Sequence, residues 1–488
     1  MKRTSPILVL AAAALFLTSC INDNGTGTGV TEASSGAVVY LADQNTDGVF
    51  ELFLTSSGVK LNGPLVSGGS VTNFALTPDK TAVVYIADQN TLGVFELFQV
   101  NIATPGVSVK LNGTLILNGD VTSFAITPDG TSVVYLADQR LDQVFEVFRV
   151  LFATPQASTL LNPALAAGRT INQSAVTPFA VTPDSTKVVY IADQDTLNVN
   201  ELYQITFSNP QNSTKLNVPL AAPKNVTDFV ISPNSASVVY LADQNINGVF
   251  EIFPAPITGP GSATSLNPPL STGQSVKAFA TNTPAFAITP DNSAVIYTAD
   301  QTTPGTIELF RVLFATPQSS VKLNGTLIAG GNVRSFTIAA NNSAVVYSAD
   351  QDIFGVVELF RVPLTPVAAA QKVNPNFVAP QSVTAFAITP DSSAAVYLAN
   401  QTVNTVVQLY RVPFSSLQTS TLLNGTLAVG GNVRSFSVTP NSTLILYLAD
   451  QTTFGVVELY AVNVGSPGAS SKLNGQLVPG GNVTAVTF

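Results

Sequence analysis

The chain has 488 residues and a formal net charge of −9, with 10% charged and 45% hydrophobic residues. An acidic chain without a cluster of Lys or Arg repels phosphate groups, which argues against nucleic-acid binding. The sequence has no His, and Cys20 is its single cysteine. A Cys/His zinc site, a Ser-His-Asp triad and a disulfide within the chain are therefore excluded.

Residues 1–19 have the pattern of an export signal. Two basic residues near the start precede an apolar run over residues 7–17, and two small polar residues follow. This run is too short for a membrane-spanning helix, which needs about 20 residues. The last four residues of the pattern, L-T-S-C, resemble the bacterial lipoprotein signal. The resemblance implies cleavage before Cys20 and acylation of that residue; an ordinary secretory signal is the alternative.

The same resemblance implies an address in the bacterial cell envelope. Ile21, rather than Asp, follows the cysteine, which favours the outer membrane if the host is Gram-negative and leaves open which side is exposed. Residues 20–37 would then comprise the lipidated cysteine and a tether, because residues 21–37 show no hydrophobic period. A flexible segment of this length reaches about 20–25 Å.

A segment of the type V-V-Y-L-A-D-Q, followed by a short turn and V-F-E-L-F, recurs nine times. Its tyrosine returns about every 50 residues, at Tyr40, Tyr85, Tyr135, Tyr190, Tyr240, Tyr297, Tyr347, Tyr397 and Tyr447. Strand-like repeats of this length indicate the blades of a β-propeller.

Each unit contains four candidate strands, named A to D from the predicted centre of the ring outward. In the unit around residue 130 they lie at 121–127, 132–138, 144–150 and, more weakly, 158–162. Strand B is an almost unbroken apolar run, which suits a strand buried on both faces. The P-D-G sequence between strands A and B has the residues of a tight turn.

The two ends of the repeated region complement each other. The first unit starts at Val38 with strand B, and residues 483–488 form a strand A without its strand B. In a ring the C-terminal strand completes the first blade, whereas an open array needs polar caps, which the terminal units lack. We therefore predict an all-β single domain over 38–488. It is a closed propeller of nine four-stranded blades, with eight blades and one aberrant unit as the fallback.

The repeat resembles that of TolB-like β-propellers. The resemblance rests on Thr127-Pro128-Asp129-Gly130 and its variants, followed by V-V-Y-x-A-D and then G-V-x-E-L-F. Two departures are Ala339-Ala340-Asn341 in place of T-P-D and Asn400 in place of the Asp that ends strand B. The resemblance implies a protein-interaction platform in the periplasm, or the non-catalytic domain of a peptidase.

Every unit except the eighth has an Asp at the end of strand B and a Glu in strand C. Examples are Asp88/Glu96, Asp138/Glu146 and Asp243/Glu251. Paired carboxylates can perform acid–base chemistry, as in glycosidases, but a catalytic site is one place and these pairs occur around the whole ring. We interpret them as structural. The eighth unit has Asn400 and Gln408 instead, which indicates that shape and hydrogen bonding matter more than charge.

The first B–C turn, D-Q-N-T-D-G, matches the first half of a calcium loop. Asp43, Asn45 and Asp47 would supply the oxygen ligands that calcium prefers. The Glu expected later in such a loop is replaced by Leu54, and most other units lose the pattern. An Asx-type hairpin turn is the alternative, and calcium is the only cofactor that the sequence suggests.

Strand A carries two further features. Arg334 and Arg434 occupy matching places where several other units have Thr; because strand A lines a propeller's channel, they would lie near one mouth, as anion contacts or as solvated rim residues. A phenylalanine recurs in strand A and is predicted to pack between blades: Phe74, Phe124, Phe179, Phe229, Phe286, Phe336, Phe386 and Phe436. Two longer units contain insertions at 171–175 and 281–284, where a unit-specific function would lie.

These features predict a non-catalytic, monomeric binding or scaffold module. Its partner would be an envelope protein or peptide, and its membrane contact would be a lipid anchor on Cys20. One alternative is a carbohydrate- or calcium-dependent surface module. A carboxylate-based lyase or glycosidase is the other.

Overall fold

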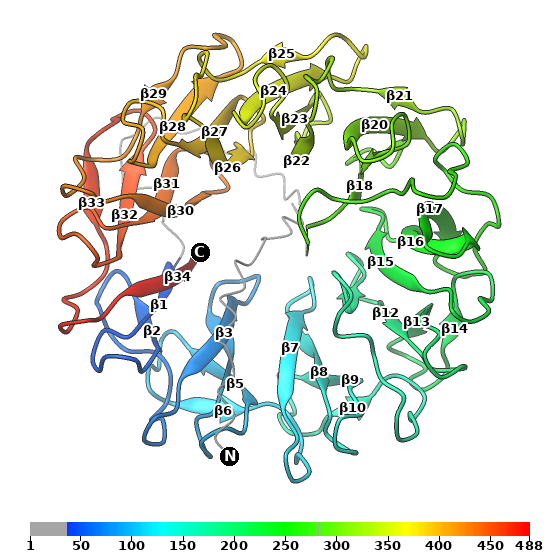
Figure 1. Cartoon of the computed structure of the whole chain (residues 1–488). Helices are drawn as coiled ribbons and strands as arrows, with labels where there is room; N and C mark the ends of the chain where they lie inside the picture. Colours follow the sequence, from blue (N-terminus) through cyan, green and yellow to red (C-terminus); the bar gives the residue numbers. More distant parts are fainter. Residues whose placement is uncertain (1–36, 282) are drawn as a thin grey trace, which may run out of the picture.

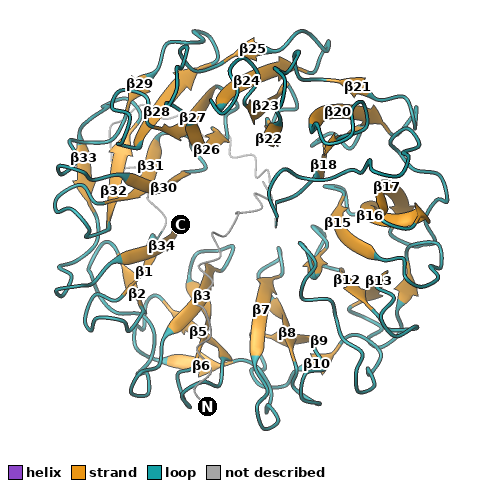
Figure 2. Cartoon of the chain, in the orientation of Figure 1, coloured by secondary structure: helices purple, strands orange, loops and turns teal. Residues whose placement is uncertain are grey.

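The computed structural model describes residues 37–281 and 283–488, which form β-strands and no helix (Figure 2). No helix in this part of the chain could cross a membrane. The predicted signal peptide 1–19, Cys20 and nearly all of the predicted tether 20–37 lie outside the described residues.

Nine sheets are arranged around a common centre, each with its strand A innermost (Figure 1). The nine innermost strands, A, are β3 (Val71–Leu76), β7 (Val121–Ile126), β11 (Phe179–Val181), β15 (Val226–Ile231), β18 (Phe286–Ile288), β22 (Val333–Ile338), β26 (Val383–Ile388), β30 (Val433–Val438) and β34 (Val483–Thr487). The B strands are β1 (Val39–Ala42), β4 (Ala82–Ala87), β8 (Ser132–Ala137), β12 (Lys187–Ala192), β16 (Ser237–Ile246), β19 (Ala294–Ala299), β23 (Ala344–Ala349), β27 (Ala394–Ala399) and β31 (Leu444–Ala449).

The outer strands complete the blades, which we number 1 to 9 in the order of their B strands. The C strands are β2 (Glu51–Leu54), β5 (Glu96–Asn101), β9 (Glu146–Leu151), β13 (Glu201–Thr206), β17 (Val249–Pro256), β20 (Glu308–Leu313), β24 (Glu358–Pro363), β28 (Gln408–Pro413) and β32 (Glu458–Asn463). The outermost D strands are β6 (Ser108–Lys110), β10 (Thr159–Leu160), β14 (Thr214–Lys215), β21 (Val321–Lys322), β25 (Gln371–Lys372), β29 (Thr421–Leu422) and β33 (Ser470–Lys472).

The predicted nine-blade ring and its closure are confirmed. Strand β34 pairs antiparallel with β1, with Val39 opposite Thr487 and Tyr40 opposite Val486. Figure 1 shows the red C-terminal strand lying beside the blue β1 in one blade. The first blade is thus built from both ends of the described chain, and the eight-blade fallback is not needed.

Strand D is reduced in two of the nine blades. In blade 1 it is a single bridge between Phe53 and Lys60. In blade 5 the sheet has three strands, β15, β16 and β17. Pro254 and Pro256 at the end of β17 have no N–H to donate, so they cannot support a regular fourth strand.

Strand B is the centre of each blade because it is apolar on both faces. All six residues of β4 are buried, and Tyr85 stacks on Phe98 of strand C with ring centroids 5.5 Å apart. The tyrosine hydroxyl donates to Gln89 Oε1 (2.6 Å), which satisfies the one polar atom of a buried ring. The core between blades joins side chains of neighbouring sheets, and the recurring phenylalanines of strand A pack there, as predicted.

The inner strands of blades 4 and 6 are interrupted. Ile171 forms an isolated bridge with Ala192, and Val276 forms one with Ala299, at the places where the other inner strands begin. The rest of each inner strand starts only at β11 and β18, which are three residues long. The intervening segments are 172–178 and the described residues of 277–285; they overlap the insertions predicted at 171–175 and 281–284, although Ile171 itself belongs to the inner strand. Figure 1 shows the segment before β18 reaching toward the centre of the ring.

Candidate functional site

The B–C turns and the D–A loops lie together at one face of the ring, which we call the turn face. Val66, in the loop from blade 1 to blade 2, donates its N–H to Gln89 O in the B–C turn of blade 2 (3.0 Å). The A–B turns and C–D loops are joined at the opposite face, where Ile102 N donates to Thr81 O (2.9 Å). The two faces therefore carry different sets of loops, and they differ in chemistry.

The buried Asp at the end of strand B fixes the turn face. In blade 2, Asp88 accepts hydrogen bonds from Ser70 N (2.6 Å) in the incoming loop and from Gly93 N (3.0 Å) in the B–C turn. Asp138 and Asp243 bridge the same two segments of their blades. The carboxylates of this series are thus occupied by backbone donors.

The Glu that starts strand C is held by a cation in most blades. Lys110 bonds to Glu96, and Arg140 lies 3.1 Å from Glu146. Glu251 has no such cation among the described residues; it accepts from Asn245 Nδ2 (2.7 Å) and Leu270 N (3.2 Å). The Lys–Glu pairs of the ring are Lys60–Glu51, Lys110–Glu96, Lys215–Glu201, Lys322–Glu308, Lys372–Glu358 and Lys472–Glu458.

In blade 8 the residue at the end of strand B is an amide, Asn400, and the conformation of the following turn explains this difference. In blade 2 the residue five positions after Asp88 is Gly93, whose φ of 77° aims its N–H at the carboxylate. Thr405 has no positive φ, because a β-branched side chain disfavours that conformation. The turn instead presents Asn404 O, which accepts from Asn400 Nδ2 (2.7 Å), while Asn400 Oδ1 accepts from Ser382 N (2.7 Å).

The strand-C amide of blade 8 follows from a second change. Leu422 stands where six blades have the lysine, so a carboxylate in strand C would lack its counter-charge. Gln408 is neutral, and its Oε1 accepts from Thr402 Oγ1 (2.9 Å) and Tyr410 Oη (2.8 Å). Blade 3 also has a leucine there, Leu160, but it retains an acid because Arg140 supplies the charge.

The predicted calcium ligands of the first turn make other bonds. Asp43 accepts from Gly48 N (3.0 Å) and Asn482 N (2.5 Å), and Asn45 Nδ2 donates to Glu51 (3.3 Å). Asp43 thus links its own B–C turn to the loop that precedes β34, and each of its oxygens accepts a backbone N–H. Across residues 37–281 and 283–488, no three Asp, Glu, His or Cys side chains gather in a way that could hold a metal ion. Calcium binding stays a prediction.

Arg334 and Arg434 lie at the start of their inner strands, on the turn face. Arg334 pairs with Asp350 (2.9 Å) and Arg434 with Asp450 (3.2 Å), and both acids are buried. Burial alone would raise the pKa of Asp350, but bonds from Arg334, Asn332 N and Gly355 N outweigh it and lower the pKa. Both guanidinium groups stay partly exposed, so the predicted anion contact stays a prediction.

Sequence reasoning missed a third cation in this series. Lys277 follows Val276 as Arg334 follows Val333, and it pairs with buried Asp300 (2.7 Å). The loop after Lys277 displaces it from the usual spacing to the next tyrosine. The local sequence Q-S-V-K, which matches Q-S-V-T before Ala385, could have revealed it.

The two insertion loops each reach the inner strand of the next blade. Thr177, from the loop of blade 4, lies close enough to Asp228 on β15 to lower its pKa, and Phe279, from the loop of blade 6, lies under the Arg334 guanidinium at 3.8 Å. Burial raises the pKa of Asp228 to about 6, against bonds from Phe229 N and Thr177 that lower it. Blades 4 to 7 therefore present unique polar contacts near the ring centre that the regular units do not have.

Exposed apolar side chains recur on the turn face. Leu117 is 86% exposed and Val429 is 98% exposed. The ring of Phe354 lies against Gly330, so close that a Cβ on residue 330 would be 3.0 Å from the ring. The exposed apolar residues of the B–C turns and D–A loops are Leu92, Leu117, Leu141, Leu197, Ile246, Ile328, Ile353, Phe354, Val378, Val403, Val429 and Phe454. The opposite face has fewer such side chains among the described residues: Val59, Val107, Leu151 and Val367.

The opposite face carries charges of both signs. Its A–B turns carry acids that accept from a neighbouring Thr or Ser; hydrogen bonds from Thr77 and Thr81 lower the pKa of Asp79. The acids of these turns are Asp79, Asp129, Asp184, Asp291 and Asp391. They are ionised at neutral pH, and cations lie beside some of them: Arg149 near Asp129 and Lys187 near Asp184 lower the pKa of these acids.

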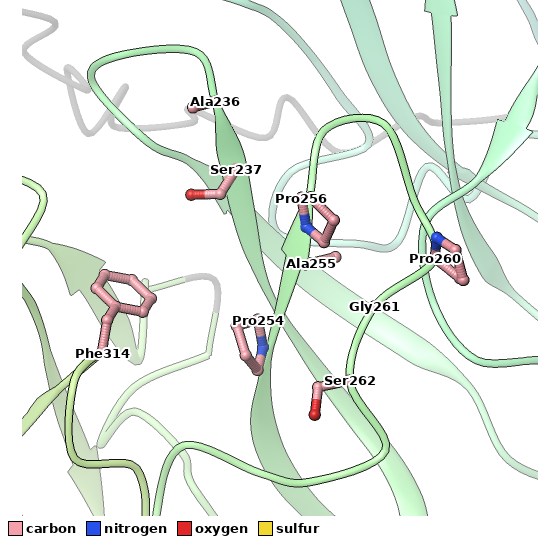
Figure 3. Close-up of a pocket in the computed structure, with 9 residues that line it drawn as sticks. All are labelled: Ala236, Ser237, Pro254, Ala255, Pro256, Pro260, Gly261, Ser262 and Phe314. Atoms are coloured by element: carbon pink, nitrogen blue, oxygen red, sulfur yellow. The ribbon is translucent and has the colours of Figure 1, made fainter.

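A shallow hollow lies on the outer edge of blade 5, where strand D is missing. Its volume is about 460 Å³, and Pro254, Pro256 and Pro260 line it with Phe314 from blade 6 (Figure 3). Ser262 N donates to Pro254 O (3.0 Å), the one bond that replaces a strand ladder there. The prolines present acceptors without donors, which protects this edge against pairing with another strand.

Solved structures of other proteins share this architecture. The eukaryotic initiation factor matches with a TM-score of 0.57 at 11% identity, covering 93% of this chain and 98% of that one. Dipeptidyl peptidase 4 of Porphyromonas gingivalis matches with a TM-score of 0.50 at 11% identity over 73% of this chain, which spans about half of it (53%). The shared fold is the β-propeller.

At such identities the similarity shows the fold alone. Oligogalacturonate lyase of Vibrio parahaemolyticus, with a TM-score of 0.41 at 12% identity over 88% of this chain and 98% of its own, is too distant to bear on function. No protein-family profile and no curated protein matches the sequence. The resemblances to the TolB-like repeat and to the lipoprotein signal stay predictions.

Proposed function

We propose that the protein is a non-catalytic scaffold of the bacterial cell envelope that binds a protein or peptide partner on its turn face. The observation that carries this proposal is the set of exposed apolar side chains on turns that buried acids hold in place. A surface that is already ordered loses little conformational entropy on binding. Similar turns around a ring also suit a broad or multivalent partner.

A lipid anchor on Cys20 fits this arrangement. Val38 precedes β1, which runs from the opposite face to the turn face, so the predicted tether joins the ring at the face opposite the turn face. The turn face then points away from the membrane and is open to a partner. We place the protein in the outer membrane if the host is Gram-negative, as a monomer.

The paired acids support a structural role over a catalytic one. Asp88 has both oxygens in backbone hydrogen bonds, and Glu96 has its lysine, so neither is free to transfer a proton. A carboxylate-based lyase or glycosidase is therefore the weaker candidate. Calcium-dependent binding would show as a rise in melting temperature at millimolar calcium.

Paired surface variants test the binding role. Replacing Phe354 and Phe454 with Ser removes two exposed rings from the turn face, and Val107→Ser makes a matched change in a C–D loop on the opposite face. Each variant is used to capture partners from an envelope extract. We expect the double variant to lose the captured protein and Val107→Ser to retain it. Equal capture by both would contradict the proposal.

The anchor has its own test. Cys20→Ser should abolish incorporation of an alkyne-tagged fatty acid and move the protein from the membrane to the soluble fraction. Incorporation that survives this substitution would contradict lipidation at Cys20.

A further inference from the structure

One pocket of the turn face is lined by Gln408 and Leu422, two positions at which blade 8 departs from the repeat. It lies in blade 8, between the B–C turn, strands β28 and β29 and the loop to blade 9, with a volume of about 450 Å³. Its lining is largely apolar: Val403, Val406, Leu422, Leu427 and Val429, with Gln408 among them. A pocket of this size accommodates one or two apolar side chains.

The equivalent place in the neighbouring blades is charged. Lys372 lies 2.9 Å from Glu358 in blade 7, and Lys472 lies 2.6 Å from Glu458 in blade 9. Entry of an apolar group there would remove water from an ion pair, which is costly. In blade 8 the same two positions hold Leu422 and Gln408, so an apolar group can enter without desolvating a charge.

The pocket also has polar side chains, Gln408, Asn424 and Thr426; the polar atoms of Asn424 are bonded to Leu409 N and Gly425 O. Gln408 uses its Oε1 as an acceptor for Thr402 and Tyr410, and its Nε2 donates to no residue within 37–281 or 283–488. A donor left free beside an apolar lining matches a carbonyl acceptor carried next to an apolar side chain. A polypeptide backbone has this combination at every residue.

We propose that the pocket of blade 8 takes an apolar side chain from a peptide segment of the protein partner, with Gln408 Nε2 donating to a backbone carbonyl of that segment. This inference rests on the proposed binding function and adds its specificity. The lack of charge selects a segment without a charged residue at the anchoring position. The rim residues Val403 and Val429, 50% and 98% exposed, would cover the flanking residues.

The experiment sorts a displayed library of random dodecapeptides against the full chain and measures affinities of the enriched peptides. The informative variant is Gln408→Glu with Leu422→Lys, which restores the ion pair of the neighbouring blades. Leu160→Lys is the matched control, because it makes the same substitution at the equivalent position of blade 3. Melting temperatures of both variants establish that the ring is intact.

We expect the enriched peptides to share an uncharged, apolar anchoring residue. Their affinity for the double variant should be at least about tenfold lower than for wild type, and their affinity for Leu160→Lys should equal that for wild type. Enriched peptides that bind wild type and double variant equally would overturn the pocket assignment and leave the binding function standing. A library that yields no binder would count against both. Concentration-dependent dimers abolished by the double variant would show that a second copy of the chain occupies the pocket, and would overturn the peptide assignment.

Discussion

Blades 2 and 8 have the same four strands in the same register, yet they hold their turns with opposite hydrogen-bond polarity. In blade 2 a carboxylate receives two backbone N–H groups, at Asp88. In blade 8 an amide receives one N–H and donates to two carbonyls, those of Pro380 and Asn404, at Asn400. Both blades therefore keep a link between two loops. Whether the linking side chain is an acid or an amide depends on whether the backbone of the B–C turn presents an N–H or a C=O group to it.

The strongest test of this comparison places the amide side chain of blade 8 at the equivalent position of blade 2. Asp88→Asn places an amide NH₂ against a backbone N–H in a buried site, so one donor loses its acceptor. We expect a loss of about 3 kcal/mol in the free energy of unfolding, measured by urea denaturation at neutral pH. Asp142→Asn, on an exposed turn, is the control and should change stability by less than about 0.5 kcal/mol. A small effect of Asp88→Asn would mean that the link does not depend on polarity.

The comparison extends to blades 5 and 7, where an acid on the inner strand, Asp228, and an acid at the end of strand B, Asp350, are held differently. Burial raises the pKa of Asp228 to about 6, whereas the bonds from Arg334 and the backbone lower the pKa of Asp350. The folded state therefore favours the neutral form of Asp228. Its contribution to stability is complete below the unfolded-state pKa and is lost as pH rises through about 6.

We expect this loss to amount to roughly 3 kcal/mol between pH 4 and pH 8. Asp228→Asn should remove that part of the pH dependence, measured as the difference in unfolding free energy between variant and wild type across the range. Asp350 gives the opposite sign: its contribution is present at neutral pH and is lost as pH falls through its lowered pKa. A parallel pH profile for Asp228→Asn and wild type would show that the carboxyl is not protonated in the fold.

The architecture could be predicted from the sequence because the same strand pattern recurs in nine units. Nine apolar B strands and the complementary ends at Val38 and 483–488 specify the ring and its closure. Strand C was placed at 144–150 but β9 begins at Glu146, because the preceding residues belong to the turn that Asp138 fixes.

The site was less predictable because it depends on departures from the repeat. Lys277 was missed because an insertion changed its spacing, and the pocket of blade 8 was not foreseen because it needs Leu422 and Gln408 to meet across two strands. Pairing of β28 with β29 brings those strands together. The sequence shows each substitution but not that the two share a pocket.

The second pair of changes in blade 8 can be reproduced in blade 2. Lys110→Leu leaves the largely buried Glu96 without its cation, and we expect a loss of about 1–2 kcal/mol. Adding Glu96→Gln should recover most of that loss, because the pair then has the chemistry of Gln408 and Leu422. Urea denaturation of the two single variants and the double variant gives the coupling energy. Strictly additive effects would mean that the two positions changed independently in blade 8.

The smallest expected effect concerns the turn that makes Asn400 necessary. Thr405→Gly permits the positive φ seen at Gly93 and lets the turn present an N–H. Alone it should lower stability by less than about 1 kcal/mol, since Asn400 Nδ2 would then face a donor. With Asn400→Asp added, the blade 2 geometry should form and stability should return to within about 0.5 kcal/mol of wild type. Asn400→Asp without the glycine should be worse than the double variant, because its carboxylate would face Asn404 O; if the two variants are equally stable, the direction of the backbone does not choose the side chain.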